Sequence, residues 1–89
     1  METIRKHYIF VGQVQGVGFR YRAANLAHML GVTGWVRNLW DGTVEMEVRG
    51  TRADIWKLVS GLREQRFIHV EEIRERTLPV EEENSFRVR

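Results

Sequence analysis

The sequence has 89 residues, enough for one hydrophobic core but too few for two, so we expect a single domain over residues 1–89. Its 43% hydrophobic and 29% charged residues are typical of a folded globular protein and exclude a disordered chain. The net charge of +2 is too small to indicate a polynucleotide-binding surface, no apolar run can span a membrane, and the lack of cysteine excludes disulfides and thiolate sites.

The first part of the chain predicts a strand, a glycine-rich loop and a helix. His7–Gln13 is rich in β-branched and aromatic residues, which favour a strand. From Phe19 the apolar spacing changes to that of one helix face: Phe19, Ala23, Leu26, Ala27 and Leu30. Gly31 is placed to end this helix in a left-handed conformation.

The middle of the chain predicts a β-hairpin. Thr33–Leu39 is rich in β-forming residues, and the segment after it alternates between apolar and charged side chains over residues 43–49. Between them, Asp41-Gly42 indicates a two-residue type I′ turn, which needs a positive φ at both positions. Glu45 and Glu47 share the outer side of the second strand, which predicts a sheet with one solvated face.

The rest of the chain predicts a second helix and two further strands. Thr51–Asp54 resembles a capping box and precedes an apolar stripe of Ile55, Leu58, Val59 and Leu62. Phe67–Arg76 predicts a strand in which Ile73 breaks the alternation, so we expect a β-bulge there. After an exposed turn near Pro79, Phe86 and Val88 predict a short closing strand.

The predicted order is therefore β-α-β-β-α-β with a short C-terminal strand. Two helices packed on a mainly antiparallel sheet form an α+β two-layer sandwich. This order is that of the ferredoxin-like fold.

The loop between the first strand and the first helix is a candidate phosphate site. It belongs to the segment GQVQGVGFR, residues 12–20. Its glycines allow a backbone that points several N–H groups at one anion, and the helix N-terminus adds a positive dipole end. Arg20 adds a planar fork of donors that fits phosphate oxygens. The alternative is a flexible connection with Arg20 on the surface. The segment matches neither a P-loop nor the dinucleotide fingerprint.

Asn38 is the second candidate. Asparagine is unfavourable in strands, yet it stands near the end of the second one. Its carboxamide donates and accepts hydrogen bonds, so it could orient a water molecule. The alternative is a residue that starts the turn by bonding its own backbone.

The histidines and tryptophans give weaker indications of a functional site. His7, His28 and His69 lack the spacing of metal ligands, so we expect no metal site. The three tryptophans favour packing in the core or at its rim: Trp35, Trp40 and Trp56.

At these residues the sequence resembles the acylphosphatases. Residues 12–20 match the first signature of that family. The second signature matches GWVRN at residues 34–38, followed by DGTVE at 41–45. The likeness covers nearly the whole chain, with one departure at Gly61–Arg66, where the family usually has a Gly-Pro turn.

The resemblance implies that the protein hydrolyses carboxyl-phosphate bonds to a carboxylate and inorganic phosphate. It assigns phosphoryl binding to Arg20 and the positioning of the attacking water to Asn38. It also implies that backbone amides complete the phosphate site, at Gln15, Gly16, Val17, Gly18 and Phe19.

The chemistry agrees with these residue types. The leaving carboxylate is the conjugate base of an acid with a pKa near ~4, so it needs no general acid. We therefore expect no cofactor and no metal, and a kcat without a side-chain titration between about pH 5 and 8. The expected partners are a small acyl phosphate and inorganic phosphate, not nucleic acid or membrane. Met1–Lys6 contains no signal-peptide core, so we expect a cytoplasmic protein. The sequence shows no evident apolar surface stripe, so we expect a monomer.

Other readings remain open. An RNA-binding module of the RRM type shares the strand order, but Glu45 and Glu47 would repel a phosphate backbone. Acylphosphatase-like domains also begin the hydrogenase-maturation carbamoyltransferases, which are much longer proteins. A non-catalytic binding role is disfavoured by the presence of both Arg20 and Asn38.

Overall fold

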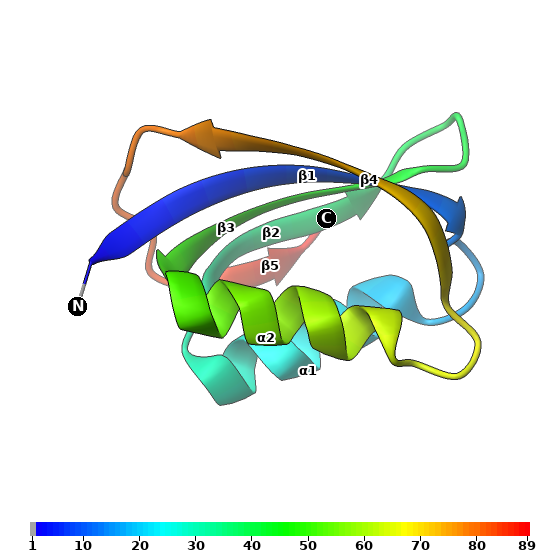
Figure 1. Cartoon of the computed structure of the whole chain (residues 1–89), viewed down its shortest axis with the longest axis horizontal. Coiled ribbons are helices and arrows are strands. Elements are labelled where there is room, and N and C mark those ends of the chain that lie inside the picture. Colours follow the sequence, from blue (N-terminus) through cyan, green and yellow to red (C-terminus); the bar gives the residue numbers. More distant parts are fainter. Residues whose placement is uncertain (1) are drawn as a thin grey trace.

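The structure is a computed structural model that describes residues 2–89. Its elements follow the predicted order: β1 (Thr3–Gln13), α1 (Phe19–Leu30), β2 (Thr33–Asn38), β3 (Val44–Thr51), α2 (Arg52–Arg63), β4 (His69–Leu78) and β5 (Phe86–Val88). The strands form one sheet in the order β4-β1-β3-β2-β5. Both helices lie against the same face of this sheet (Figure 1). The ferredoxin-like two-layer fold with a short last strand is confirmed.

The strand directions determine where the predicted site residues lie. β1 and β2 each pair with β3 in the antiparallel sense. The two strands are therefore parallel to each other, with β3 between them, and their carboxyl ends meet at one edge of the sheet. The glycine loop follows β1 and Asn38 ends β2, so both lie at this edge.

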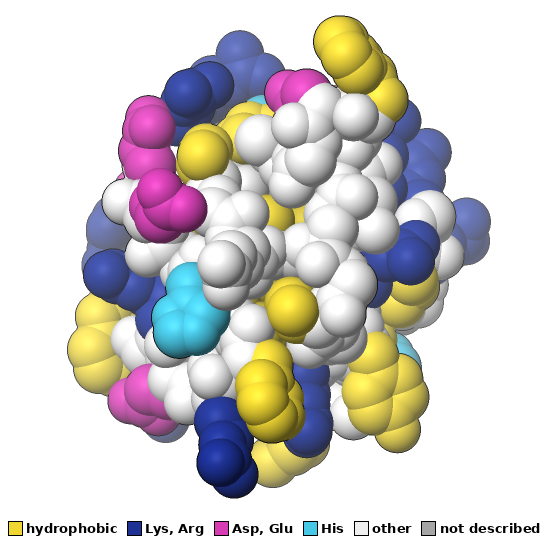
Figure 2. All heavy atoms as spheres, turned by 90° about the vertical axis from the view of Figure 1, so that its right-hand side faces the viewer, with side chains coloured by type: hydrophobic (Ala, Val, Ile, Leu, Met, Phe, Trp, Pro, Cys, Tyr) yellow, Lys and Arg dark blue, Asp and Glu magenta, His cyan; other side chains and the backbone are white. Residues whose placement is uncertain are grey.

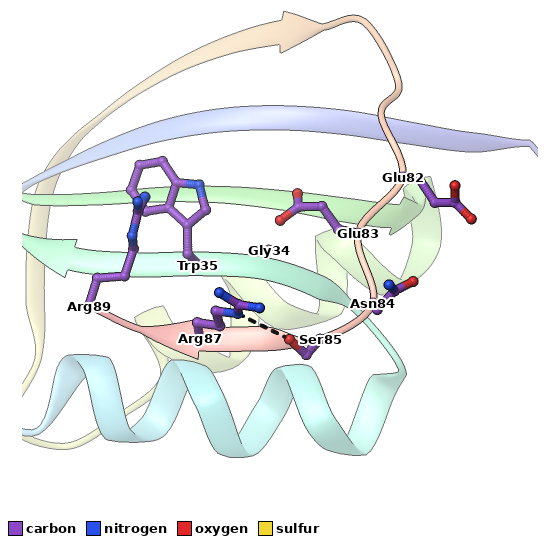
Figure 3. A pocket seen from close by; sticks show the side chains of 8 residues that line it. All are labelled: Gly34, Trp35, Glu82, Glu83, Asn84, Ser85, Arg87 and Arg89. Carbon is purple, nitrogen blue, oxygen red and sulfur yellow. Dashed lines mark hydrogen bonds between the residues drawn. The ribbon is translucent and has the colours of Figure 1, made fainter.

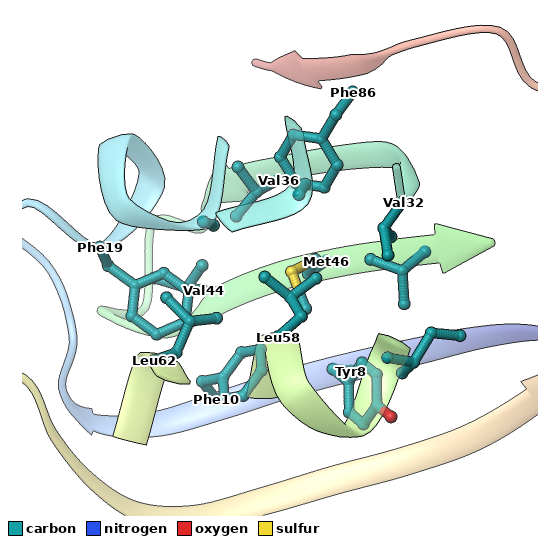
Figure 4. Close-up of a cluster of buried hydrophobic side chains, with 14 of the residues drawn as sticks. Tyr8, Phe10, Phe19, Val32, Val36, Val44, Met46, Leu58, Leu62 and Phe86 are labelled. Carbon is teal, nitrogen blue, oxygen red and sulfur yellow. The ribbon is translucent and has the colours of Figure 1, made fainter. Parts of the chain in front are cut away.

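The core lies between the sheet and the helices (Figure 4). The predicted alternation of β3 is confirmed, because Val44, Met46 and Val48 are all fully buried. Phe19, the first residue of α1, packs its ring 4.9 Å from that of Phe10, measured between ring centroids. The glycine loop is thus followed at once by a residue anchored in the core.

The other face of the sheet carries a network of ion pairs. Glu45 accepts from Arg37 at 2.6 Å and lies 2.8 Å from the Nε2 atom of His7, while Glu47 pairs with Arg5. The two glutamates are only 16% and 17% exposed, which is less than a solvated face predicts. Burial raises the pKa of Glu45, but the bonds from His7 and Arg37 outweigh it and leave the pKa below its usual value.

The ends of two strands differ from the prediction. β1 begins at Thr3 rather than His7, because its charged first residues have partners across the sheet: Lys6 donates to Glu75 at 3.0 Å. β4 spans His69–Leu78 rather than Phe67–Arg76. The predicted bulge is confirmed, since the pairing with β1 shifts by one residue between Val70 and Glu72.

The β2–β3 turn was predicted wrongly. No residue other than glycine has a positive φ within the described chain, so Asp41 excludes a type I′ turn. The amide of Gly42 instead donates to Leu39, and Gly42 takes a φ of 91°. The Asp41 carboxylate accepts from the side chain and amide of Thr43, and these bonds lower its pKa.

Two tryptophans do not pack in the core. The side chains of Trp40 and Trp56 are 98% and 69% exposed. Trp35 is half-buried on the face without helices, where Arg89 lies 4.7 Å from its ring centroid. None of the helices within residues 2–89 is both long and apolar enough to cross a membrane.

Candidate active site

The glycine loop has an open backbone. Gly16 and Gly18 take φ angles of 73° and 80°, which other L residues rarely adopt. A Cβ at either position would meet nothing within 4 Å, so the backbone conformation and not space requires glycine. Within residues 2–89, the backbone N–H groups of Gly16, Val17 and Gly18 donate to no backbone acceptor.

The Gln15 side chain joins this loop to the β2–β3 turn. Its Nε2 atom donates to the carbonyl oxygens of Leu39 at 2.6 Å and Thr43 at 2.9 Å. The bond to Thr43, 28 residues away in sequence, therefore joins the two signature segments directly. This side-chain role was not predicted.

Arg20 is the second residue of α1, and its guanidinium is anchored. Nη1 donates to the main-chain oxygen of Arg89 at 3.2 Å. The Arg89 amide in turn donates to Val36 of β2 at 2.8 Å. The last residues of the chain thus orient the guanidinium beside the end of β2.

Arg20 and Asn38 line the same pocket, with a volume of about 310 Å³. Gly16, Gly18 and Phe19 also line it, so the structure brings together five of the seven predicted site residues. The other two lie outside its lining: Gln15 bonds the turn, and Val17 packs against the core. Figure 2 shows this end of the molecule, where backbone and polar side chains form a broad area bordered by hydrophobic and basic groups.

Three lining residues were not predicted: Val14, Tyr21 and Val88. Val14 is fully buried and forms the floor with Phe19. Tyr21 follows Arg20 directly in the sequence, so its proximity to a predicted site residue could have identified it as a lining residue. Val88 is remote in sequence from both motifs, and only the parallel pairing of β5 with β2 brings it here.

A larger pocket of about 370 Å³ lies beside β5 on the face without helices (Figure 3). Trp35, Arg87 and Arg89 form one wall, and Glu82 and Glu83 form another. Its charges are of both signs and it contains none of the predicted site residues. The smaller pocket is therefore the candidate active site.

Comparisons with known proteins agree with this geometry. The sequence model described as Acylphosphatase matches residues 6–88. The chain belongs to the acylphosphatase family. An acylphosphatase of Bordetella parapertussis is 56% identical over 63 residues, which are 71% of this chain and 65% of that protein. The match thus spans less than two thirds of this curated relative.

Solved structures extend the acylphosphatase likeness over nearly the whole chain. That of an acylphosphatase from Coxiella burnetii has a TM-score of 0.90 and 36% identity, covering 98% of this chain and 93% of that one. Full-length HypF in its phosphate- and nucleotide-bound form has a TM-score of 0.85 and 26% identity. It covers 98% of this chain, which corresponds to 12% of the HypF chain.

Proposed function

We propose that this protein is an acylphosphatase that hydrolyses acyl phosphates to a carboxylate and inorganic phosphate. The supporting observation is that Arg20, the loop glycines and Asn38 line one pocket in a chain of this family. This pocket lies at the edge of the sheet where the carboxyl ends of the parallel strands β1 and β2 meet.

In this proposal the phosphoryl group binds between the glycine loop and Arg20. The amides of Gln15–Phe19 donate to its oxygens, and the guanidinium adds two charge-assisted bonds. The helix supports this assignment. A cation in the first turn of a helix is disfavoured by the dipole, and α1 has no acidic residue or side-chain cap there. A bound phosphoryl group would supply the negative charge that this first turn lacks and would accept hydrogen bonds in place of the missing side-chain cap.

Asn38 orients the attacking water in the same proposal. The phosphoryl group passes through a loose transition state whose charge spreads over its outer oxygens, so positioning and electrostatics provide most of the catalysis. The carboxamide holds the water in line with the breaking bond, and an oxygen of the substrate accepts the water's proton. The carboxylate leaves as an anion, so neither a general acid nor a cofactor is needed.

The test is the hydrolysis of benzoyl phosphate by the purified protein, followed by ultraviolet absorbance in buffer containing EDTA. We expect turnover with the chelator present and a kcat that stays level between about pH 5 and 8. No turnover of either benzoyl or acetyl phosphate would refute the proposal. A histidine-like titration of kcat would refute the water-positioning mechanism alone.

We further propose that the chain acts as a single-domain monomer on small molecules in the cytoplasm. On the sheet face without helices, Glu45 and Glu47 form ion pairs within the chain, and this arrangement does not support the RNA-binding alternative. Gel filtration with light scattering tests the monomer.

A further inference from the structure

The candidate active site is larger than a phosphoryl group. Four heavy atoms at about 30 Å³ each, the volume per molecule of liquid water, occupy roughly 120 Å³. The pocket has about 310 Å³. More than half of its volume therefore remains for another part of the substrate.

The remaining lining includes two exposed hydrophobic residues. Val88 is 50% exposed and has the same parity on β5 as the buried Phe86, so its side chain is on the helix side of the sheet. Tyr21 is 68% exposed in the first turn of α1, and α1 packs against β5. Neither residue belongs to the core cluster.

Hydrophobic side chains exposed at the border of a polar pocket are typical of ligand contacts. We propose that Tyr21 and Val88 form a subsite for the acyl group and give the enzyme a preference for acyl phosphates with an aromatic or large apolar body. This inference rests on the proposed function.

The subsite acts on binding rather than on the chemical step. The acyl group keeps its contacts with the subsite in the ground state and in the transition state, because the bond that breaks lies between oxygen and phosphorus. Interactions of equal strength in both states lower KM and leave kcat unaffected. The preference is therefore expected in KM.

The experiment compares kcat/KM for benzoyl and acetyl phosphate in the natural protein, Tyr21→Ala and Tyr21→Phe. An aromatic contact contributes about 0.5–1.5 kcal/mol beyond area burial, so the benzoyl-to-acetyl ratio is expected to fall roughly 2- to 12-fold in Tyr21→Ala, through the KM for benzoyl phosphate. Tyr21→Phe keeps the ring and is expected to keep the ratio. Val88→Ala is expected to lower it as well.

Trp56→Ala is the matched control. Trp56 is exposed to almost the same degree as Tyr21, at 69%, but lies on α2 outside this pocket, so its removal is expected to leave the ratio unchanged. An unchanged ratio in both Tyr21→Ala and Val88→Ala would overturn the subsite while the acylphosphatase activity stands. An equal fall in Trp56→Ala would also overturn it. Failure of the natural protein to hydrolyse either substrate refutes the proposed function instead.

Discussion

Arg20 stands where helix electrostatics favours an acidic residue. It is the second residue of α1, and the first turn of this helix contains no acid. Such local conflicts with folding preferences are typical of functional positions. The Arg20 guanidinium donates to the main-chain oxygen of Arg89 at 3.2 Å, and Arg20 lines the same pocket as Asn38.

Replacing Arg20 tests the fork rather than the charge. In Arg20→Lys the ammonium keeps the charge but cannot make two parallel bonds, so one charge-assisted bond of about 1.5–3 kcal/mol is lost. We expect inorganic phosphate to inhibit this variant at least about tenfold more weakly. The measurement is the inhibition constant of phosphate against benzoyl phosphate. Arg22→Lys, at an exposed position of the same helix, is the control; an equal loss there would show that the effect does not come from the fork of Arg20.

Asn38 is expected to affect turnover more than binding. In Asn38→Ala the water loses its orienting group, and removal of one such preorganised polar group typically lowers kcat about 10²–10³-fold. The inhibition constant of phosphate should change far less, because the amides and Arg20 remain. Steady-state kinetics with phosphate inhibition separates the two effects. Retention of most of kcat would exclude the water-positioning role.

At this scale the sequence predicts the polar residues of the site better than the apolar ones. Arg20 was predicted because it follows the glycine loop with donors that fit phosphate, and Asn38 because asparagine is unfavourable in a strand, and both lie in motifs of the family that the sequence resembles. The Gln15 side chain was missed, since its acceptors are carbonyl oxygens of a turn whose geometry the motif does not encode. Val88 was missed because nothing in a three-residue strand indicates its partner strand.

At the scale of elements, the close approach of β2 to β3 depends on one glycine. A Cβ at Gly34 would lie 1.9 Å from the carbonyl oxygen of Glu47, and its φ is 140°. The contact is with backbone, so no side chain can move aside. This glycine therefore determines how closely the strand that carries Asn38 packs against its neighbour.

Gly34→Ala is expected to destabilise the fold by at least about 3 kcal/mol, since a backbone clash adds to an unfavourable φ. Gly31→Ala is the matched control. Gly31 also has a positive φ but no atom within 4 Å of its Cβ position, so only the strain of about 1–2 kcal/mol applies. Urea unfolding followed by circular dichroism measures both. Equal losses would show that φ alone accounts for Gly34.

The boundaries of the elements show what local patterns cannot predict. The start of β1 has charged residues that give no strand signal alone, and their partners lie on β3 and β4. The bulge in β4 was predictable, because a break in side-chain alternation is visible in the sequence itself. The turn was not, since Asp-Gly fits both a two-residue turn and a longer one with glycine in the last position.

For the whole molecule, the topology brings the site together. Neither motif contains the information that β3 pairs between β1 and β2, yet this pairing places the glycine loop beside Asn38. The order of elements was predictable from their periodicity, and the resemblance to a family supplied the arrangement. The exposure of Trp40 and Trp56 was not predictable, because an apolar residue type does not determine burial.

Glu45 links the three central strands of the sheet. It lies on β3 and bonds Arg37 on β2 and His7 on β1, and these bonds lower its pKa below the usual value. A carboxyl with a depressed pKa contributes stability above its unfolded pKa of about 4.3 and loses it as pH falls through the lower folded value. The stability from this network is therefore present at neutral pH and disappears in acid.

Glu45→Gln is expected to be less stable than the natural protein by about 1 kcal/mol near pH 6, and the difference should shrink toward zero near pH 2. The measurement is the free energy of unfolding in urea at a series of pH values. Glu82→Gln is the control, because Glu82 makes no ion pair within residues 2–89. A difference for Glu45→Gln that stays constant from neutral pH into acid would mean that its carboxylate charge does not hold the central strands together.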